Sequence, residues 1–154
     1  MFKILVATDG SDYANKAADY AGQLARQIDG AEITVLSVLD ADLIVQTAVS
    51  SSGIPMTIPV ATPLDLERAL EAVLQDTRER LSSTVKKVAV RLEHGKPARV
   101  ICEIADKESF NLIVIGPCGQ GRVADILLGS VSDKVVHEAT VPVLIVKTKE
   151  GHKK

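Results

Sequence analysis

Short apolar runs alternate along this chain with segments in which apolar residues recur every three or four positions. The first run, residues 3–8, is rich in branched side chains and ends at an Asp-Gly turn, which is typical of a strand covered on both faces. Helical spacing follows from Ala14 to Ile28, and Gly30 then supplies a residue suited to a left-handed helix end. A second apolar run at 31–39 completes a strand–helix–strand prediction for this part of the chain.

The same alternation resumes after a long connection. Residues 41–62 show no clear periodicity, and we expect a long loop there. A helix is predicted to begin after this loop, because Thr62 suits the N-cap, Pro63 the first helical position and Asp65 the first turn. Its apolar stripe reaches Leu81. Further strands are predicted at 85–94, 110–115 and 141–146, and further helices at 98–106 and from about Ser130.

This order of elements predicts an α/β fold. Strands that alternate with amphipathic helices favour a parallel sheet with helices on both faces. Five strands joined by right-handed crossovers form a doubly wound, open, Rossmann-like sheet, and ligands bind such sheets where the strand order reverses, at the carboxyl ends of the strands. We expect one domain at residues 1–148, followed by a charged tail at 149–154.

Composition narrows the functional classes. A length of 154 residues suits one domain, and a net charge of −2 gives no electrostatic reason to expect nucleic-acid or membrane partners. Aromatic residues make up 3% of the chain, which argues against base stacking. Two cysteines do not make a disulfide scaffold, and no apolar run approaches the roughly 20 residues that span a bilayer. We also find no signal peptide, so a soluble, cytoplasmic protein is expected.

A glycine-marked loop follows the strand predicted at 110–115. Gly116, Gly119 and Gly129 allow the backbone to approach an anion closely, and their amides can act as donors. The helix predicted from Ser130 offers unpaired N–H groups and the positive end of its dipole. Arg122 adds a positive charge to the same loop. The pattern is compatible with phosphate binding, although it is neither the dinucleotide fingerprint nor a Walker A loop.

Each of these features also has a plainer interpretation. The loop fits an ordinary strand-to-helix turn equally well, with Ser130 as the N-cap and Asp133 completing a capping box. Asp9 fits the acceptor position of a tight Asp-Gly turn. Val38 fits a core position, and Arg122 fits a solvated surface. From the pattern alone, both interpretations stay open.

Several motifs together resemble the universal stress protein family, and the resemblance covers essentially the whole chain outside residues 41–65. It implies an ATP-binding regulatory protein of the stress response, with strand order 3-2-1-4-5 and a homodimer formed through the last strand, residues 141–146. The glycine spacing is the family's nucleotide-binding pattern. The motifs that carry the resemblance are Gly116-x2-Gly119-x9-Gly129-Ser130, residues 4–11, 38–40, 127–132 and 141–146.

The resemblance also implies a role for each part of the site. Asp9 would meet the ribose–adenine part of ATP, Val38 would line the adenine pocket, and the glycines with the start of the last helix would hold the phosphates. Mg²⁺ is expected to accompany the ATP. With Arg122 added from the loop pattern, the candidate site residues are Ala7, Thr8, Asp9, Val38, Ile115, Gly116, Gly119, Arg122, Gly129, Ser130, Val131 and Ser132.

The loop departs from the family pattern at two positions. Pro117 has no N–H to donate, and Cys118 stands where relatives commonly carry a basic residue. We therefore expect nucleotide affinity or phosphate preference to differ from that of relatives. Cys118 is either a redox-sensitive thiol whose pKa is lowered by helix amides or an unreactive loop residue.

Three functional classes remain open. The first is an ATP-binding regulatory protein that acts as a homodimer, and the second is a slow ATPase or phosphotransferase. The third is a stress-related interaction protein that does not bind nucleotide. Phosphoryl transfer needs a lysine on the phosphates and carboxylates that hold metal ions. The loop at 116–122 contains no lysine, and no His, Cys, Asp and Glu residues have metal-site spacing, so no catalytic or metal site is predicted.

Overall fold

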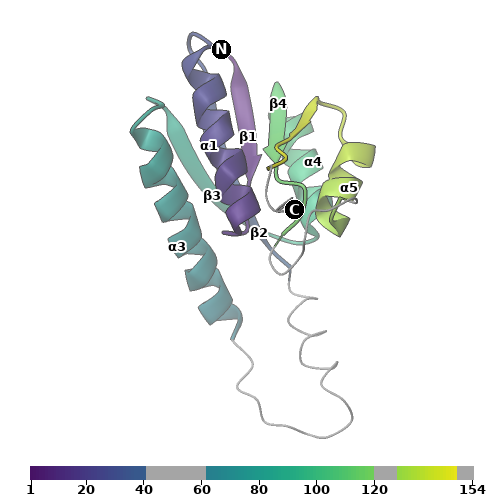
Figure 1. Ribbon diagram of the computed structural model, residues 1–154. Helices are drawn as coiled ribbons and strands as arrows, with labels where there is room; N and C mark the ends of the chain where they lie inside the picture. Colours follow the sequence, from purple (N-terminus) through teal and green to yellow (C-terminus); the bar gives the residue numbers. More distant parts are fainter. Residues whose placement is uncertain (41–61, 120–127, 149–154) are drawn as a thin grey trace, which may run out of the picture.

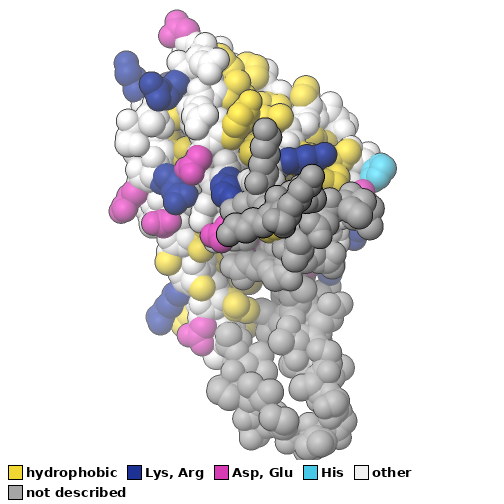
Figure 2. Space-filling view, in the orientation of Figure 1, with side chains coloured by type: hydrophobic (Ala, Val, Ile, Leu, Met, Phe, Trp, Pro, Cys, Tyr) yellow, Lys and Arg dark blue, Asp and Glu magenta, His cyan; other side chains and the backbone are white. Residues whose placement is uncertain are grey.

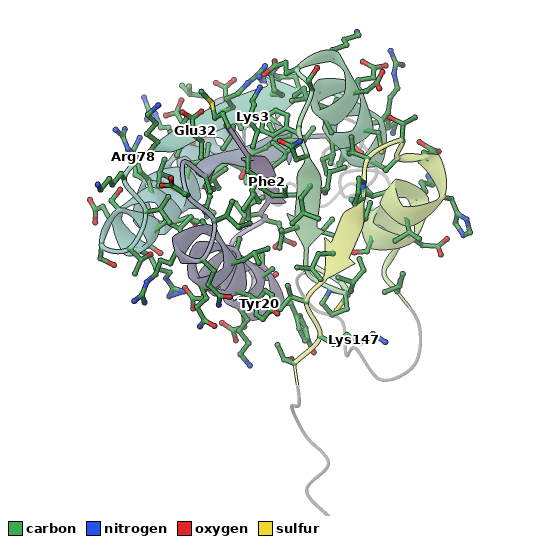
Figure 3. All side chains as sticks on the ribbon, turned by 90° about the horizontal axis from the view of Figure 1, so that it is seen from above. Phe2, Lys3, Tyr20, Glu32, Arg78 and Lys147 are labelled. Atoms are coloured by element: carbon green, nitrogen blue, oxygen red, sulfur yellow. The ribbon has the colours of Figure 1, made fainter. Side chains whose placement is uncertain are left out.

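The computed structural model describes residues 1–40, 62–119 and 128–148. A parallel sheet forms its centre, with helices on both faces (Figures 1 and 3). The strands are β1 (Lys3–Ala7), β2 (Glu32–Leu39), β3 (Val88–His94), β4 (Leu112–Ile115) and β5 (Val143–Ile145). The helices are α1 (Asp12–Arg26), α3 (Pro63–Ser82), α4 (Pro97–Lys107) and α5 (Ser130–Glu138).

The strand order is β3-β2-β1-β4-β5, which confirms the predicted doubly wound α/β fold. The order reverses beside β1, where Val6 is in register with Val35 of β2 and with Val114 of β4. All of these pairs are parallel, so the carboxyl ends of β1, β2 and β4 meet at one edge of the sheet. In Figure 1 the arrowheads of β1 and β4 point to this edge.

The core has two halves, one on each face of the sheet. Ile4 and Val6 pack with α1 and α3, whereas Leu5 and Ala7 pack with α4 and α5. Ile4, Leu5 and Val6 are each 0% exposed, because β1 is covered on both faces. The continuous apolar run that predicted this strand is therefore explained by its central position.

The predicted start of α3 is confirmed in detail. Thr62 is the N-cap and Pro63 is the first helical residue. The Thr62 hydroxyl accepts from the Asp65 N–H at 3.1 Å, and the Asp65 carboxylate accepts from the Thr62 N–H at 3.1 Å. The two bonds form a complete capping box, which satisfies N–H groups that have no partner inside the helix.

Four elements depart from the sequence prediction by two residues or more. The first helix ends at Arg26 instead of Ile28, because the Gln27 and Ile28 amides bond to carbonyls three residues back and close a tighter last turn. Residue 85 belongs to the turn after α3, since its N–H donates to the Leu81 carbonyl. The fourth strand begins at Leu112 because the N–H of residue 110 donates to the end of α4. The last strand is confined to Val143–Ile145.

Candidate functional site

A cleft of about 330 Å³ lies at the carboxyl ends of β1, β2 and β4, beside the start of α5. Every candidate site residue predicted from the sequence lines this cleft, except Arg122, which lies outside the described residues. The structure therefore brings together segments that are more than 100 positions apart in the chain, from Ala7 to Ser132. That these residues bind a ligand stays a prediction at this point.

The turn after β1 places a carboxylate at the mouth of the cleft. The Asp9 side chain is exposed, and its Oδ1 accepts from the Ser11 N–H at 3.0 Å. The Thr8 hydroxyl accepts from the Gly10 N–H at 3.2 Å. Gly10 has φ +82° and is packed against Val73, so this position requires glycine. Asp9 therefore does act as the acceptor in this turn, as the plainer interpretation held. Its other carboxylate oxygen, Oδ2, faces Gly119.

Three glycines form close contacts around the cleft. A Cβ on Gly116 would lie 3.1 Å from the backbone of Tyr13, and one on Gly129 would lie 3.1 Å from Cys118 Cα. A Cβ on Gly119 would collide with Asp9 Oδ2. Gly116 and Gly129 thus have a packing reason to be glycine, because backbone atoms stand in the way of a Cβ, whereas at Gly119 the obstacle is the end of the Asp9 side chain.

The start of α5 excludes the capping box that the plainer interpretation of the loop contained. Gly129 is the N-cap and Ser130 is already the first helical residue, so Ser130 does not cap the helix with Asp133. The reason is local: the Gly129 N–H donates to the Pro117 carbonyl at 2.8 Å, which holds Gly129 in the extended conformation of a cap. Among the described residues no side chain caps this helix, and its first residues line the cleft.

The first turn of α5 is tied to the end of β4 by a side chain. The Ser132 hydroxyl donates to the Gly116 carbonyl at 2.8 Å, and Ser132 is only 3% exposed. By contrast, Ser130 is exposed. The positive end of the α5 dipole and the N–H groups of its first turn favour an anion at this end of the cleft.

The opposite part of the cleft is apolar. Leu36 and Val38 of β2 line it together with Pro97 and Ile101 from the first turns of α4. The sequence analysis placed Cys118 in the loop, and it too lines the cleft; four other lining residues were missed: Ala14, Leu36, Pro97 and Ile101. Leu36 could have been found from the sequence, because side chains alternate along a strand and Leu36 therefore shares a face with Val38, which was predicted to line the site. The cleft therefore has an apolar part and a part rich in backbone amides.

The two cysteines have different surroundings, and neither forms a disulfide. Cys118 is buried and lines the cleft. Cys102 lies on α4 and is partly buried; burial, with a smaller contribution from the nearby Glu138 carboxylate, raises the pKa of its thiol. On α4, Cys102 packs against the half of the core that α4 and α5 cover.

Other kinds of site find no support in the described residues. Within residues 1–40, 62–119 and 128–148, no three His, Cys, Asp or Glu side chains gather in a way that would hold a metal ion. No helix in the same ranges is long and apolar enough to cross a membrane.

Comparisons with known proteins agree on one family. Residues 1–147 match the Universal stress protein family. A universal stress protein of Thermus aquaticus is 36% identical over 152 residues, which cover 96% of this chain and 100% of the relative.

Solved structures agree with the sequence comparison. The structure of the hypothetical protein MJ0577 has a TM-score of 0.80 at 26% identity and covers 97% of each chain. The crystal structure of a universal stress protein in complex with cAMP has a TM-score of 0.68 at 26% identity, covering 94% of this chain and 97% of that one. The second of these holds an adenine nucleotide.

Proposed function

The chain belongs to the universal stress protein family, and on that premise we propose that it binds ATP with Mg²⁺ in the cleft beside α5. The observation that carries the proposal is the division of the cleft into an apolar part and a part lined by helix-terminal amides. A purine ring packs against apolar side chains, and a phosphate chain accepts hydrogen bonds from backbone amides. The cAMP complex of a relative supports an adenine nucleotide as the ligand.

Each part of the cleft has a role in this proposal. The adenine packs between Val38 of β2 and Pro97 and Ile101 of α4. The exposed Asp9 carboxylate accepts a hydrogen bond from a ribose hydroxyl, as a charged acceptor does strongly. The adenine and ribose thus occupy the part of the cleft beside β1 and β2.

The phosphates lie against Gly116, Gly119 and the first turn of α5, which line the cleft together. Mg²⁺ that accompanies the nucleotide would be held chiefly by the phosphates and would neutralise part of their charge, because this ion usually takes few protein ligands. Arg122 remains a predicted phosphate ligand that lies outside the described residues.

We further propose that nucleotide binding regulates a homodimer in the cytoplasm, instead of serving catalysis. β5 pairs with β4 on one side and lies at the end of the strand order, so its other side is a sheet edge. Apolar side chains gather near this edge in Figure 2, and Leu144 and Val146 are only partly buried. An exposed apolar edge favours pairing with a second copy around a two-fold axis.

Calorimetric titration of nucleotide-stripped protein with Mg·ATP tests the central proposal. We expect micromolar binding, weaker binding of GTP, and loss of binding in Gly129→Ala. The matched control is Thr62→Ala, which weakens the fold at the start of α3, away from the cleft. A parent protein that is folded and does not bind any adenine nucleotide would contradict the proposal.

Two further measurements separate the related possibilities. Sedimentation at micromolar concentration is expected to give a dimer of the 16.4 kDa chain, and a single monomeric species would contradict the assembly proposed. Phosphate release measured with saturating Mg·ATP distinguishes binding from turnover. Multiple turnovers per minute that are lost in Gly129→Ala would favour the slow ATPase instead.

A further inference from the structure

Two buried serine hydroxyls hold the two turns that form the cleft. Ser37 Oγ donates to the Thr8 carbonyl at 2.7 Å, and Ser132 Oγ donates to the Gly116 carbonyl at 2.8 Å. Ser37 is 1% exposed and Ser132 is 3% exposed. A hydroxyl buried this deeply is costly unless it is hydrogen-bonded, so both bonds are firm features of the fold.

The two carbonyls occupy matching positions on neighbouring strands. Val6 and Val114 are in register, and each carbonyl lies two residues further along, just beyond the last residue of β1 or β4. Thr8 leads directly to Asp9, whereas Gly116 leads to the loop that ends at Gly119. The hydroxyls therefore act at the points where each strand changes into a turn of the cleft.

Ser37 does not itself line the cleft, although its neighbours Leu36 and Val38 do. Because side chains alternate along a strand, Ser37 lies on the opposite face of β2, the face shared with Val35. The Thr8 N–H also donates to the Leu36 carbonyl at 2.9 Å. Leu36 thus binds the N–H of Thr8, and its neighbour Ser37 binds the carbonyl of Thr8.

We propose that Ser37 is a positioning residue for the ribose end of the cleft, acting through Thr8 on the Asp9 carboxylate. This inference rests on the proposed binding of ATP. Ser132 has the corresponding action on the phosphate end, through Gly116. Removal of the Ser37 hydroxyl releases the turn at Thr8 and weakens contacts to the ribose. Removal of the Ser132 hydroxyl releases the turn at Gly116 and weakens contacts to the phosphates.

The test compares the affinities of ATP and adenosine, the second measured by displacement of ATP. Ser37→Ala is expected to weaken both ligands by about the same factor, roughly tenfold for one lost positioning bond, so their affinity ratio stays constant. Ser132→Ala is expected to weaken ATP by about tenfold and leave adenosine unchanged. Ser37→Cys keeps a weaker donor in the same place and is expected to give an intermediate loss of affinity.

Thr77→Val is the matched control, because Thr77 is also 1% exposed and its hydroxyl donates to the Val73 carbonyl at 2.8 Å, away from the cleft lining. It removes a comparable bond and is expected to leave both affinities unchanged. The inference is overturned if Ser37→Ala leaves both affinities unchanged, if it weakens ATP alone, or if Thr77→Val weakens both equally. Failure of the parent to bind ATP would overturn the proposed function as well.

Discussion

Gly119→Ala tests whether the phosphate loop and the Asp9 carboxylate depend on each other. A Cβ at position 119 would lie closer to Asp9 Oδ2 than the 3.0 Å below which real Cβ atoms have essentially no contacts. Among the described glycines, Gly10, Gly30 and Gly95 have positive φ and Gly119 does not, so alanine at 119 carries no left-handed backbone strain. The carboxylate must therefore move, and the effect of the substitution comes from that movement.

The size of the effect on stability and on ATP affinity follows from the hydrogen bonds that the Asp9 carboxylate accepts. Asp9 Oδ1 accepts from the Ser11 N–H at 3.0 Å, so displacement of the side chain costs at least this hydrogen bond, or about 1 kcal/mol of stability. A hydrogen bond from a ribose hydroxyl to a carboxylate contributes about 1.5–3 kcal/mol, which corresponds to a loss of affinity of roughly 10- to 100-fold. We expect Gly119→Ala to remain folded and to bind ATP that much more weakly.

A double-mutant cycle with Asp9→Ala makes this prediction decisive. In the Asp9→Ala background no carboxylate remains to be displaced, so Gly119→Ala is expected to change ATP affinity by less than about threefold, near the limit of additivity. Calorimetry gives the four affinities, and urea denaturation confirms that all four proteins are folded. If alanine at 119 costs the same factor in both backgrounds, the reasoning about Asp9 is refuted.

Three other substitutions test separate parts of the account. Gly129→Ala places a Cβ 3.1 Å from Cys118 Cα, and we expect a stability loss of about 1–2 kcal/mol in urea denaturation together with loss of ATP binding. Thr62→Ala removes the cap of α3 and is expected to cost about 1 kcal/mol of stability with ATP affinity unchanged, which denaturation and calorimetry report together. In a Cys118→Ser variant, the Cys102 thiol is expected to react with iodoacetamide at pH 8 more slowly than in the urea-unfolded chain. Its raised pKa leaves less thiolate at that pH, and an equal or faster rate would contradict the burial that we assign to it.

The fold was largely predictable, because the apolar runs of β1 and β2 and the helical spacing between them each indicate one kind of element. The order of the strands was not available from periodicity, and the resemblance to a family supplied it. Boundaries were missed where a backbone hydrogen bond at a helix end decides them. Phe110, for example, extends an apolar run in the sequence, yet its N–H bonds to the end of α4.

The candidate site was predictable to the extent that strand ends and glycines mark it. Pro97 and Ile101 were missed because their spacing on α4 equally suits a core face, and only the sheet order brings α4 to the cleft. The contact between Gly119 and Asp9 and the bond from Ser37 to Thr8 join residues 110 and 29 positions apart in the chain. No local pattern reports pairings of that kind.

The most direct test of the central claim is an amide chemical-shift titration of ¹⁵N-labelled, nucleotide-stripped protein with Mg·ATP. If ATP binds in the cleft, the largest shift changes are expected at Asp9, Gly119 and the first turn of α5, with small changes along α3. Saturating ATP that leaves these amides unmoved, or that shifts only residues outside the cleft, would contradict the account.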